Sequence, residues 1–263
     1  MSLSREQMLV EMGLGPIWRV RDQVPPSEFC PAPALEPEMP LVPASLTKPD
    51  VRTEQPSSEG QLPSVALAAP NWPDLAKQVA ECRACSLCQQ RKQAVLGVGD
   101  RQADWLFVGE GPGAEEDVQG EPFVGQAGKL LDNMLAALDL KRDNKVYIAN
   151  AVKCRPPGNR TPEAAEMAAC RPYLERQIAL IKPKIIVLLG KAAVHSVLHE
   201  DKTLASMRGH CFDYQGIPVV VTYHPAYLLR NLPDKAKAWE DLLLARRILR
   251  QKVTVATNPD LPF

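Results

Sequence analysis

Four short apolar runs recur along the second part of the chain and determine its predicted architecture. They occupy residues 105–108, 146–149, 185–189 and 219–222. Each run is short and continuous in its hydrophobicity, which is typical of strands that are buried on both faces in a parallel sheet.

Segments with a helical spacing of apolar positions separate these runs. They occupy residues 126–138, 162–181, 192–198 and 235–251. Because strands and helices alternate, we predict an α/β fold with three layers, α/β/α, around a central four-stranded parallel sheet with right-handed crossovers.

The first 72 residues follow a different pattern. Residues 23–73 hold 12 of the 25 prolines and show little periodicity, so we predict a disordered linker over residues 23–72. Residues 1–22 are predicted to form a short amphipathic peptide that is too small to fold alone. Its apolar positions are Met8, Leu9, Met12, Leu14, Ile17 and Trp18. We expect one folded domain over residues 73–252 and a tail over residues 253–263.

Composition narrows the class of protein. Of the 263 residues 45% are hydrophobic, which is ample for a core. No run of about eighteen apolar residues occurs, so no transmembrane helix is expected. The N-terminal sequence lacks the apolar stretch of a secretory signal. Seven cysteines without such a signal fit a reducing compartment, and we therefore expect a cytoplasmic location.

Charge is balanced overall but unevenly distributed. Residues 1–72 hold 5 Lys/Arg and 9 Asp/Glu, against 26 and 22 in residues 73–263. The modest positive charge of the predicted domain permits contact with nucleic acid but does not by itself indicate it.

Four cysteines have the spacing of a metal or cluster site. Cys82 and Cys85 form a CxxC pair, predicted to open a helix, and Cys154 and Cys170 follow far downstream. A CxxC pair joined by two distant cysteines is typical of a four-thiolate site closed by the fold. Unrelated buried thiols are the alternative. Cys88 offers a further thiolate near the pair.

A glycine-rich, acidic loop over residues 109–132 lies between a predicted strand and a predicted helix. It is neither a Walker A motif nor GxGxxG, and its acidic residues Glu110, Glu115, Glu116 and Asp117 would repel a phosphate tail. A solvated acidic turn is the alternative. The motifs GEGPG, NAVK, GK and HPAY each follow a predicted strand, so we expect them to meet at the sheet edge where α/β proteins bind ligands.

Five motifs carry a resemblance to a known family. CRACSL, GEGPG, EPFVGQAGKLLD, NAVKCRPPGNRTP and HPAYLLRN, in this order over roughly residues 73–252, resemble the iron–sulfur (type 4) uracil-DNA glycosylases of bacteria and archaea. The resemblance implies a monofunctional enzyme that flips uracil from DNA and hydrolyses its N-glycosidic bond, initiating base excision repair. It also implies a [4Fe-4S] cluster on Cys82, Cys85, Cys154 and Cys170. Zinc stays the alternative, because four thiolates suit both.

The resemblance also implies roles in reading the base. Asn150 would read uracil N3–H and O4 through its carboxamide, Phe123 would stack on the base, and His224 would stabilise negative charge at O2. Each has a structural alternative: a capping Asn, a core Phe, or a satisfied His.

For water activation, Glu110 and Gly111 occupy the positions of a Gln and the water-activating Asp of the classical enzymes. That Asp is glycine here, so Glu110 or Glu116 would orient the water. The alternative for Glu116 is to exclude the methyl group of thymine. The backbone N–H groups of Gly111 and Gly113 would help to bind the base, and Asn159 would contact water or phosphate.

DNA contacts are assigned to the remaining motif residues. Arg160 and Arg230 would contact phosphates, and Leu228 or Leu229 would fill the emptied base stack as a wedge.

Two rival hypotheses remain. The first is a protein of the same superfamily that bonds covalently to uracil DNA, but the basic, His-containing insertion of such proteins is missing after GQAG here. The second is a non-catalytic iron–sulfur module of the replication machinery. No lysine is placed for β-elimination. Residues 8–21 resemble the N-terminal peptide by which the psi subunit of the DNA polymerase III clamp loader docks on chi. We expect a monomer that acts on uracil-containing DNA. The second resemblance implies chi as a replisome partner of residues 1–22, and a peptide that folds back onto its own domain is the alternative.

Overall fold

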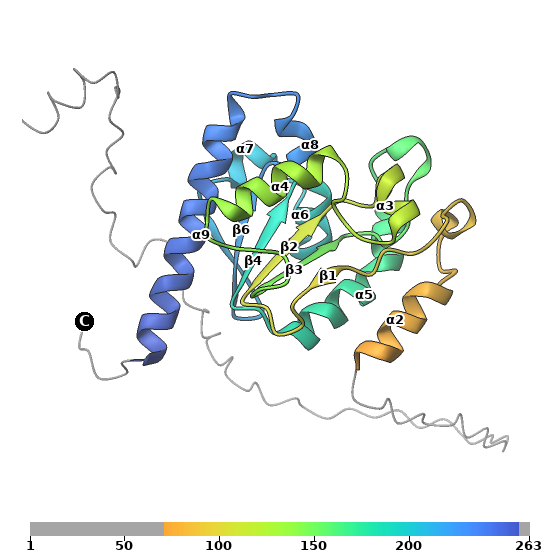
Figure 1. The fold of residues 1–263 in the computed structure, drawn as a ribbon, viewed down its shortest axis with the longest axis horizontal. Coiled ribbons are helices and arrows are strands. Elements are labelled where there is room, and N and C mark those ends of the chain that lie inside the picture. The colour runs from red at the N-terminus through yellow and green to blue at the C-terminus, as the bar shows by residue number, and fades with distance from the viewer. Residues whose placement is uncertain (1–70, 258–263) are drawn as a thin grey trace, which may run out of the picture.

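The computed structural model describes residues 71–257, with side chains to residue 252 (Figure 1). The predicted docking peptide, the predicted linker up to residue 70 and residues 258–263 of the predicted tail lie outside the described residues. Asn71 and Trp72, which were assigned to the linker, instead belong to the start of α2.

A six-stranded sheet with the order β1-β3-β2-β4-β6-β5 forms the centre of the domain (Figure 1). Its strands are β1 Val98–Gly99, β2 Trp105–Gly109, β3 Val146–Asn150, β4 Ile185–Leu189, β5 Cys211–Tyr214 and β6 Ile217–Thr222. The four central strands are parallel and correspond to the four predicted apolar runs. The prediction of a central parallel sheet is therefore confirmed.

Two antiparallel edge strands were not predicted. β1 pairs with β3 over only two residues, and β5 pairs with β6 in a hairpin. The hairpin turns at Gln215 and Gly216, which both have positive φ, as a tight turn between two strands requires. These strands have partly exposed residues, so they lack the continuous apolar run of a buried strand.

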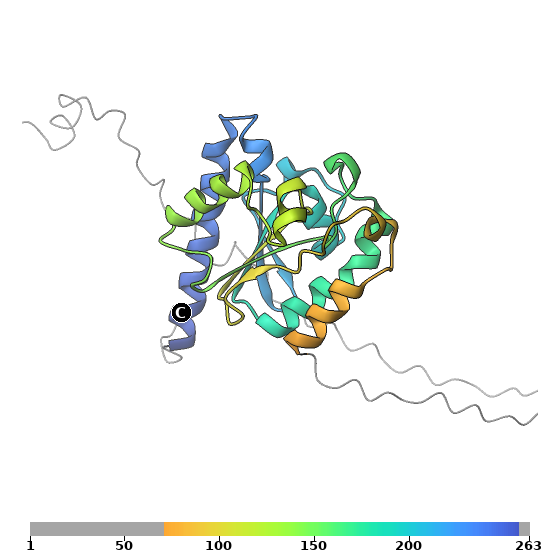
Figure 2. The same ribbon diagram turned by 45° about the vertical axis from the view of Figure 1, so that its right-hand side comes forward.

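Helices cover both faces of the sheet (Figure 2). They are α2 Trp72–Glu81, α3 Ala114–Gln119, α4 Gln126–Ala136, α5 Ala164–Ile181, α6 Lys191–Leu198, α7 Leu204–Met207, α8 Pro225–Leu228 and α9 Asp234–Thr257, with short 3-10 turns at Ser86–Gln89 and Pro157–Asn159. The four predicted helices are present with boundaries shifted by a few residues. The largest shift is at α9, which continues into the segment predicted as a tail. No described helix has the length and apolarity needed to cross a bilayer.

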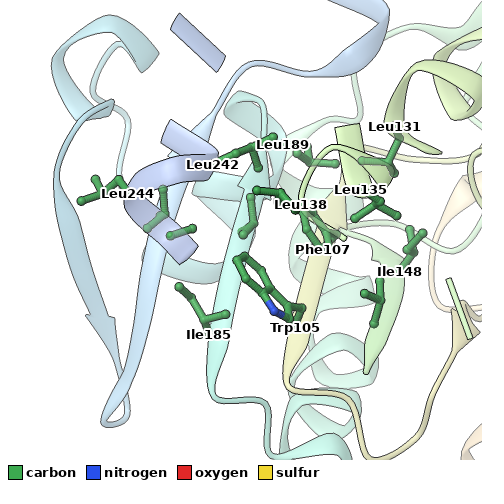
Figure 3. Packing of buried hydrophobic residues seen from close by; sticks show 14 of the residues in the cluster. Trp105, Phe107, Leu131, Leu135, Leu138, Ile148, Ile185, Leu189, Leu242 and Leu244 are labelled. Atoms are coloured by element: carbon green, nitrogen blue, oxygen red, sulfur yellow. The ribbon is translucent and has the colours of Figure 1, made fainter. Parts of the chain in front are cut away.

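The alternation of β2 divides the core into two layers. Trp105 and Phe107 point to the face covered by α4 and α9 (Figure 3). Leu106 and Val108 point to the face covered by α5 and α6. Because successive strand residues point to opposite faces, one apolar run fills both layers and fixes the register of the sheet.

The CxxC pair lies differently from the prediction. Cys82 is the C-cap of α2, so the pair follows a helix instead of opening one. Figure 2 shows α2 running beside α5, the helix that carries Cys170. This packing brings the end of α2 toward the second pair of cysteines.

Candidate active site and cysteine site

A cavity of about 450 Å³ lies where β2, β3 and β6 end. The loops that follow these strands form its walls, as expected for ligand sites in open α/β sheets. It brings together ten of the twelve side chains or backbones predicted for catalysis and substrate binding: Glu110, Gly111, Gly113, Glu116, Phe123, Asn150, Asn159, Arg160, His224 and Arg230. Thr161 and Tyr227 also line it and were not predicted, although both lie inside the motifs NAVKCRPPGNRTP and HPAYLLRN.

His224 follows β6 and caps the first turn of α8. Its Nδ1 accepts the backbone N–H of Ala226 at 3.2 Å, so the proton of the neutral ring lies on Nε2. Burial lowers the pKa of His224 to about 4, with a smaller contribution from Arg230. The ring is therefore a neutral hydrogen-bond donor at physiological pH.

Phe123 packs against His224, with ring centroids 5.4 Å apart. Its backbone has a positive φ of 57°, and Arg142 holds this strained turn by donating to the carbonyls of Pro122 and Phe123. A Cβ at Gly109 would lie 2.5 Å from both the Phe123 ring and Asn150 Oδ1. Glycine at the end of β2 therefore allows the ring and the carboxamide to approach each other.

Asn150, the last residue of β3, has a side chain that is only 2% exposed. Its Oδ1 is buried and has no hydrogen-bond partner among the described residues. An unpaired buried acceptor is costly, and native proteins keep one where a ligand or solvent molecule pairs with it. The cavity thus offers an acceptor that a donor on a ligand would satisfy.

Glu116 holds the loop around the cavity together. One carboxylate oxygen accepts the N–H groups of Val124 and Gly125 at 3.1 and 3.2 Å, and the other accepts that of Gly113 at 3.1 Å. Both oxygens are thus engaged, which assigns Glu116 a structural part that differs from the predicted water activation. The Gly113 N–H is therefore already paired with Glu116. This differs from the prediction that it helps to bind the base.

Glu110 is the second predicted carboxylate that lines the cavity. Burial raises its pKa, and a hydrogen bond from Thr161 partly opposes this shift. A half-buried carboxylate with a raised pKa in a cleft is the kind of group that acts as a general base.

The loop after β3 departs in part from the prediction. Asn159 is exposed, has positive φ, and accepts Arg155 Nε at 2.7 Å. Arg160 forms a bidentate pair with buried Glu166 at 2.8 and 2.7 Å, which lowers the pKa of that carboxyl group. Its guanidinium therefore anchors the loop to α5. Arg230 is exposed and has no ion pair among the described side chains, so it stays available for phosphate.

The two predicted wedge residues differ in exposure. Leu228 is 1% exposed because the α8 turn directs it toward α4 and α9, which excludes it as a wedge in this conformation. Leu229 is 41% exposed, and Leu232, which was not predicted, is 60% exposed. The apolar tip of this loop is thus formed by Leu229 and Leu232.

A second hollow contains the cysteines. It lies between the end of α2, the CxxC loop, the segment after β3 and α5. Its cysteines are Cys82, Cys85, Cys88, Cys154 and Cys170. Arg91 donates to Cys154 Sγ at 2.8 Å and to the carbonyls of Ala80 and Cys82 at the end of α2.

Burial changes the properties of three of these thiols. It raises the pKa of Cys154 and of Cys85, and it raises the pKa of Cys170 to about 11. Reactive cysteines usually have lowered pKa values and exposed sulfurs, and the buried Cys154 and Cys170 have neither. Among the described residues, no three potential ligands converge closely enough to hold a single metal ion.

The sequence matches known proteins over this same domain. The profile of the uracil DNA glycosylase superfamily matches residues 96–243. The type-4 uracil-DNA glycosylase of Archaeoglobus fulgidus is 42% identical over 164 residues, covering 59% of this chain and 82% of that protein. That of Thermotoga maritima is 41% identical over 182 residues, covering 68% and 94%, and that of Sulfurisphaera tokodaii is 46% identical over 174 residues, covering 63% and 78%. A type-5 uracil-DNA glycosylase of Pyrobaculum aerophilum is 33% identical over 151 residues, covering 51% and 66%. With a six-stranded α/β domain, an acceptor-lined cavity at its ligand edge and these matches, the chain belongs to the uracil DNA glycosylase superfamily and, within it, to the type-4 enzymes.

Proposed function

We propose that this protein is a monofunctional uracil-DNA glycosylase that flips uracil out of DNA and hydrolyses its N-glycosidic bond, initiating base excision repair. The observation that carries the proposal is the buried, unpaired Oδ1 of Asn150 in a cavity that also presents a neutral His224 and the Phe123 ring. These are the three groups that recognition of a flipped pyrimidine requires.

Asn150 reads the Watson–Crick edge of the base. Its Oδ1 accepts N3–H of uracil while its amide N–H₂ donates to O4. Cytosine reverses both groups at these positions, so it would leave Oδ1 unpaired and face donor against donor. Phe123 offers the aromatic surface on which the base stacks.

His224 and Glu110 act on the two sides of the bond that breaks. The sugar becomes cationic while the bonding electrons leave with the base, and the Nε2–H of His224 donates to O2 as negative charge grows there. Glu110 orients a water that attacks the anomeric carbon and takes its proton. The products are free uracil and an abasic site.

The DNA is held by the rim of the cavity. Arg230 contacts a phosphate, and Leu229 fills the space that the flipped nucleotide leaves in the stack. Incubation with a uracil-containing oligonucleotide followed by alkali cleavage tests the proposal. Cleavage at the uracil only after alkali supports it, and an intact strand rejects it.

A pair of glutamate substitutions separates the two carboxylates. Glu110→Gln should lower the single-turnover rate of uracil release by about a hundredfold or more, with little change in thermal stability, because it removes the base. Glu116→Gln should instead destabilise the domain by roughly 2 kcal/mol, because it weakens charge-assisted bonds to three backbone N–H groups. Single-turnover kinetics and thermal melts measure both. The assignment is wrong if Glu116→Gln keeps its melting temperature and loses the chemistry.

The cysteine hollow is proposed to bind a [4Fe-4S] cluster through Cys82, Cys85, Cys154 and Cys170. Support for the proposal comes from the four cysteines that line one hollow and from membership in the type-4 family. Zinc stays the alternative, because four thiolates suit both groups. The cluster would pin residues 155–166 near the DNA face, and no redox role is assigned to it.

Metal content should distinguish the two cofactors. Protein purified anaerobically should be brown, contain iron, and lose visible absorbance with dithionite. Alanine at any of the four proposed ligands should give unstable protein without iron, whereas Cys88→Ala should retain iron. Colourless protein with stoichiometric zinc would reject the cluster.

The N-terminal peptide is proposed to bind a replication protein. An apolar peptide with Ile17 and Trp18 as anchors, tethered by a proline-rich linker, is what a docking motif needs, and chi is the proposed partner. We further propose that the protein is a monomer and that it acts in the cytoplasm.

Residues 1–22 should therefore recover a replisome component in pull-downs, and Trp18→Ala should abolish recovery. The fragment predicted from the sequence, residues 73–263, lacks Trp72 and the N-cap Asn71 of α2. Residues 71–263 should therefore be used, and they should keep full glycosylase activity. Loss of domain stability on removing residues 1–22 would instead indicate that the peptide folds back onto its own domain.

A further inference from the structure

Lys153 is a fully buried cation between the two sites. It lies three residues after Asn150 and directly before Cys154, and it is 1% exposed. No described carboxylate forms an ion pair with it. A buried amino group is unfavourable unless hydrogen-bond acceptors or an opposite charge compensate for its lost hydration.

The cysteines provide the opposite charge on one side. Lys153 lines the cysteine hollow, and its backbone N–H donates to Cys170 Sγ at 3.2 Å. Four thiolates outweigh the positive charge of an iron–sulfur core, so a cluster on these ligands would be anionic. Lys153 is then a counter-ion beside it.

The ammonium group reaches the recognition residue on the other side. Its Nζ donates to the main-chain carbonyl of Asn150 at 2.8 Å and to Gln177 Oε1 at 2.5 Å. Gln177 in turn donates to the carbonyl of Leu96 and to the Tyr147 hydroxyl. A largely buried network thus fixes the backbone at the end of β3, where the Asn150 side chain lines the cavity.

We propose that Lys153 is a positioning residue that couples the cysteine site to base recognition, with its charge balanced by the metal–thiolate centre and its ammonium group holding the backbone of Asn150. The inference rests on the proposed function and extends it to a residue that contacts neither base nor sugar. It explains why a cation occupies the core at this point of the chain.

Lys153→Met in the full-length protein tests both halves, since methionine keeps much of the length and removes the charge and the donors. Iron release to a chelator should become about tenfold faster or more, as for other residues that support metal ligands. The single-turnover rate of fully iron-loaded protein should fall by about tenfold to a hundredfold, the effect of a small misplacement at a site. Lys77→Met, which removes an exposed lysine of α2, is the matched control and should change neither.

Coupling to Asn150 is measured by a double-mutant cycle. In an Asn150→Ala background, Lys153→Met should cost less than about threefold in rate, because the group that it positions is gone. Losses that simply multiply would overturn the positioning role. If Lys153→Met cannot be purified with iron, Gln177→Leu tests the same network with the charge intact. It should keep normal iron content and lose rate only when Asn150 is present, and an equal loss in both backgrounds would overturn the inference.

The two halves fail separately from the proposed function. Unchanged iron release in Lys153→Met would overturn the counter-ion role. Absence of uracil excision by the wild-type protein would overturn the proposed function and the recognition half together, while the iron-release measurement would still test the link to the cysteines.

Discussion

His224→Ala should raise the activation free energy of the chemical step by roughly 2–4 kcal/mol, which lowers its rate by tens- to several hundred-fold. The imidazole is held by its Nδ1 contact with the Ala226 N–H, so it presents Nε2–H to the cavity in a fixed direction. A donor that is already oriented stabilises charge on the leaving base without reorganisation. Single-turnover kinetics with a uracil oligonucleotide measure the loss.

Binding to abasic DNA separates this effect from general damage to the site. The product has no O2 to accept a hydrogen bond, so its affinity should change much less than the rate. His210→Ala, at an exposed histidine outside the cavity, should leave both unchanged. A full single-turnover rate in His224→Ala would make the residue structural.

The pH dependence follows from the same environment. The folded state lowers the pKa of His224 from its usual 6.5 to about 4, so the neutral form is favoured by folding. Its contribution to stability is complete above about pH 6.5 and is lost as pH falls toward 4, by roughly 3 kcal/mol at most. The pH–rate profile should therefore show no change near pH 6.5 that is due to this histidine. Between pH 6.5 and pH 4, His224→Ala should also lose less stability than the wild-type protein, because it lacks the buried imidazole.

The central sheet could be predicted from the sequence because its strands are covered on both faces. Residues such as Phe107 and Val187 belong to short, continuous apolar runs, and runs of this length between helical segments usually form buried parallel strands. The edge strands could not be predicted in this way. β1 has two half-buried residues, and β5 mixes exposed Asp213 with partly buried neighbours.

The gathering of the site at one edge also follows from the sequence, because each motif comes after a parallel strand. What individual residues do within the site depends on contacts that spacing does not determine. In the sequence, Glu110 and Glu116 are two similar acidic residues of one loop. In the structure, the carboxylate of Glu116 accepts three backbone N–H groups and that of Glu110 does not. The same applies to Leu228 and Leu229, which a single helical turn directs to opposite environments.

The burial of Lys153 could not be predicted from the sequence, because a lysine beside cysteines is normally exposed. Only the packing of α5 against the segment after β3 shows that it is buried. The sequence thus predicts which segments meet, while charge balance in the core becomes visible only in the structure.

Asn150→Asp should raise the activation free energy of uracil release by roughly 1–3 kcal/mol and so lower its rate. This is the discrimination expected of one bidentate contact to a base edge. The carboxylate keeps the acceptor for N3–H but replaces the donor to O4 with a second acceptor. Uracil then faces repulsion where it had a hydrogen bond, whereas the amino group of cytosine finds an acceptor. The ratio of cytosine to uracil release should therefore rise relative to the wild-type protein, measured on matched single-stranded oligonucleotides that differ in one base.

Asn150→Ala distinguishes altered reading from simple loss. It removes acceptor and donor together, so uracil release should fall without any gain in relative release of cytosine. Because Oδ1 has no partner among the described residues, its removal in Asn150→Ala breaks no hydrogen bond of that oxygen. Asn150→Asp places a carboxylate at a buried position, so thermal melts must show that both variants fold. Wild-type uracil release by Asn150→Asp would place the base elsewhere in the cavity and take Asn150 out of the site.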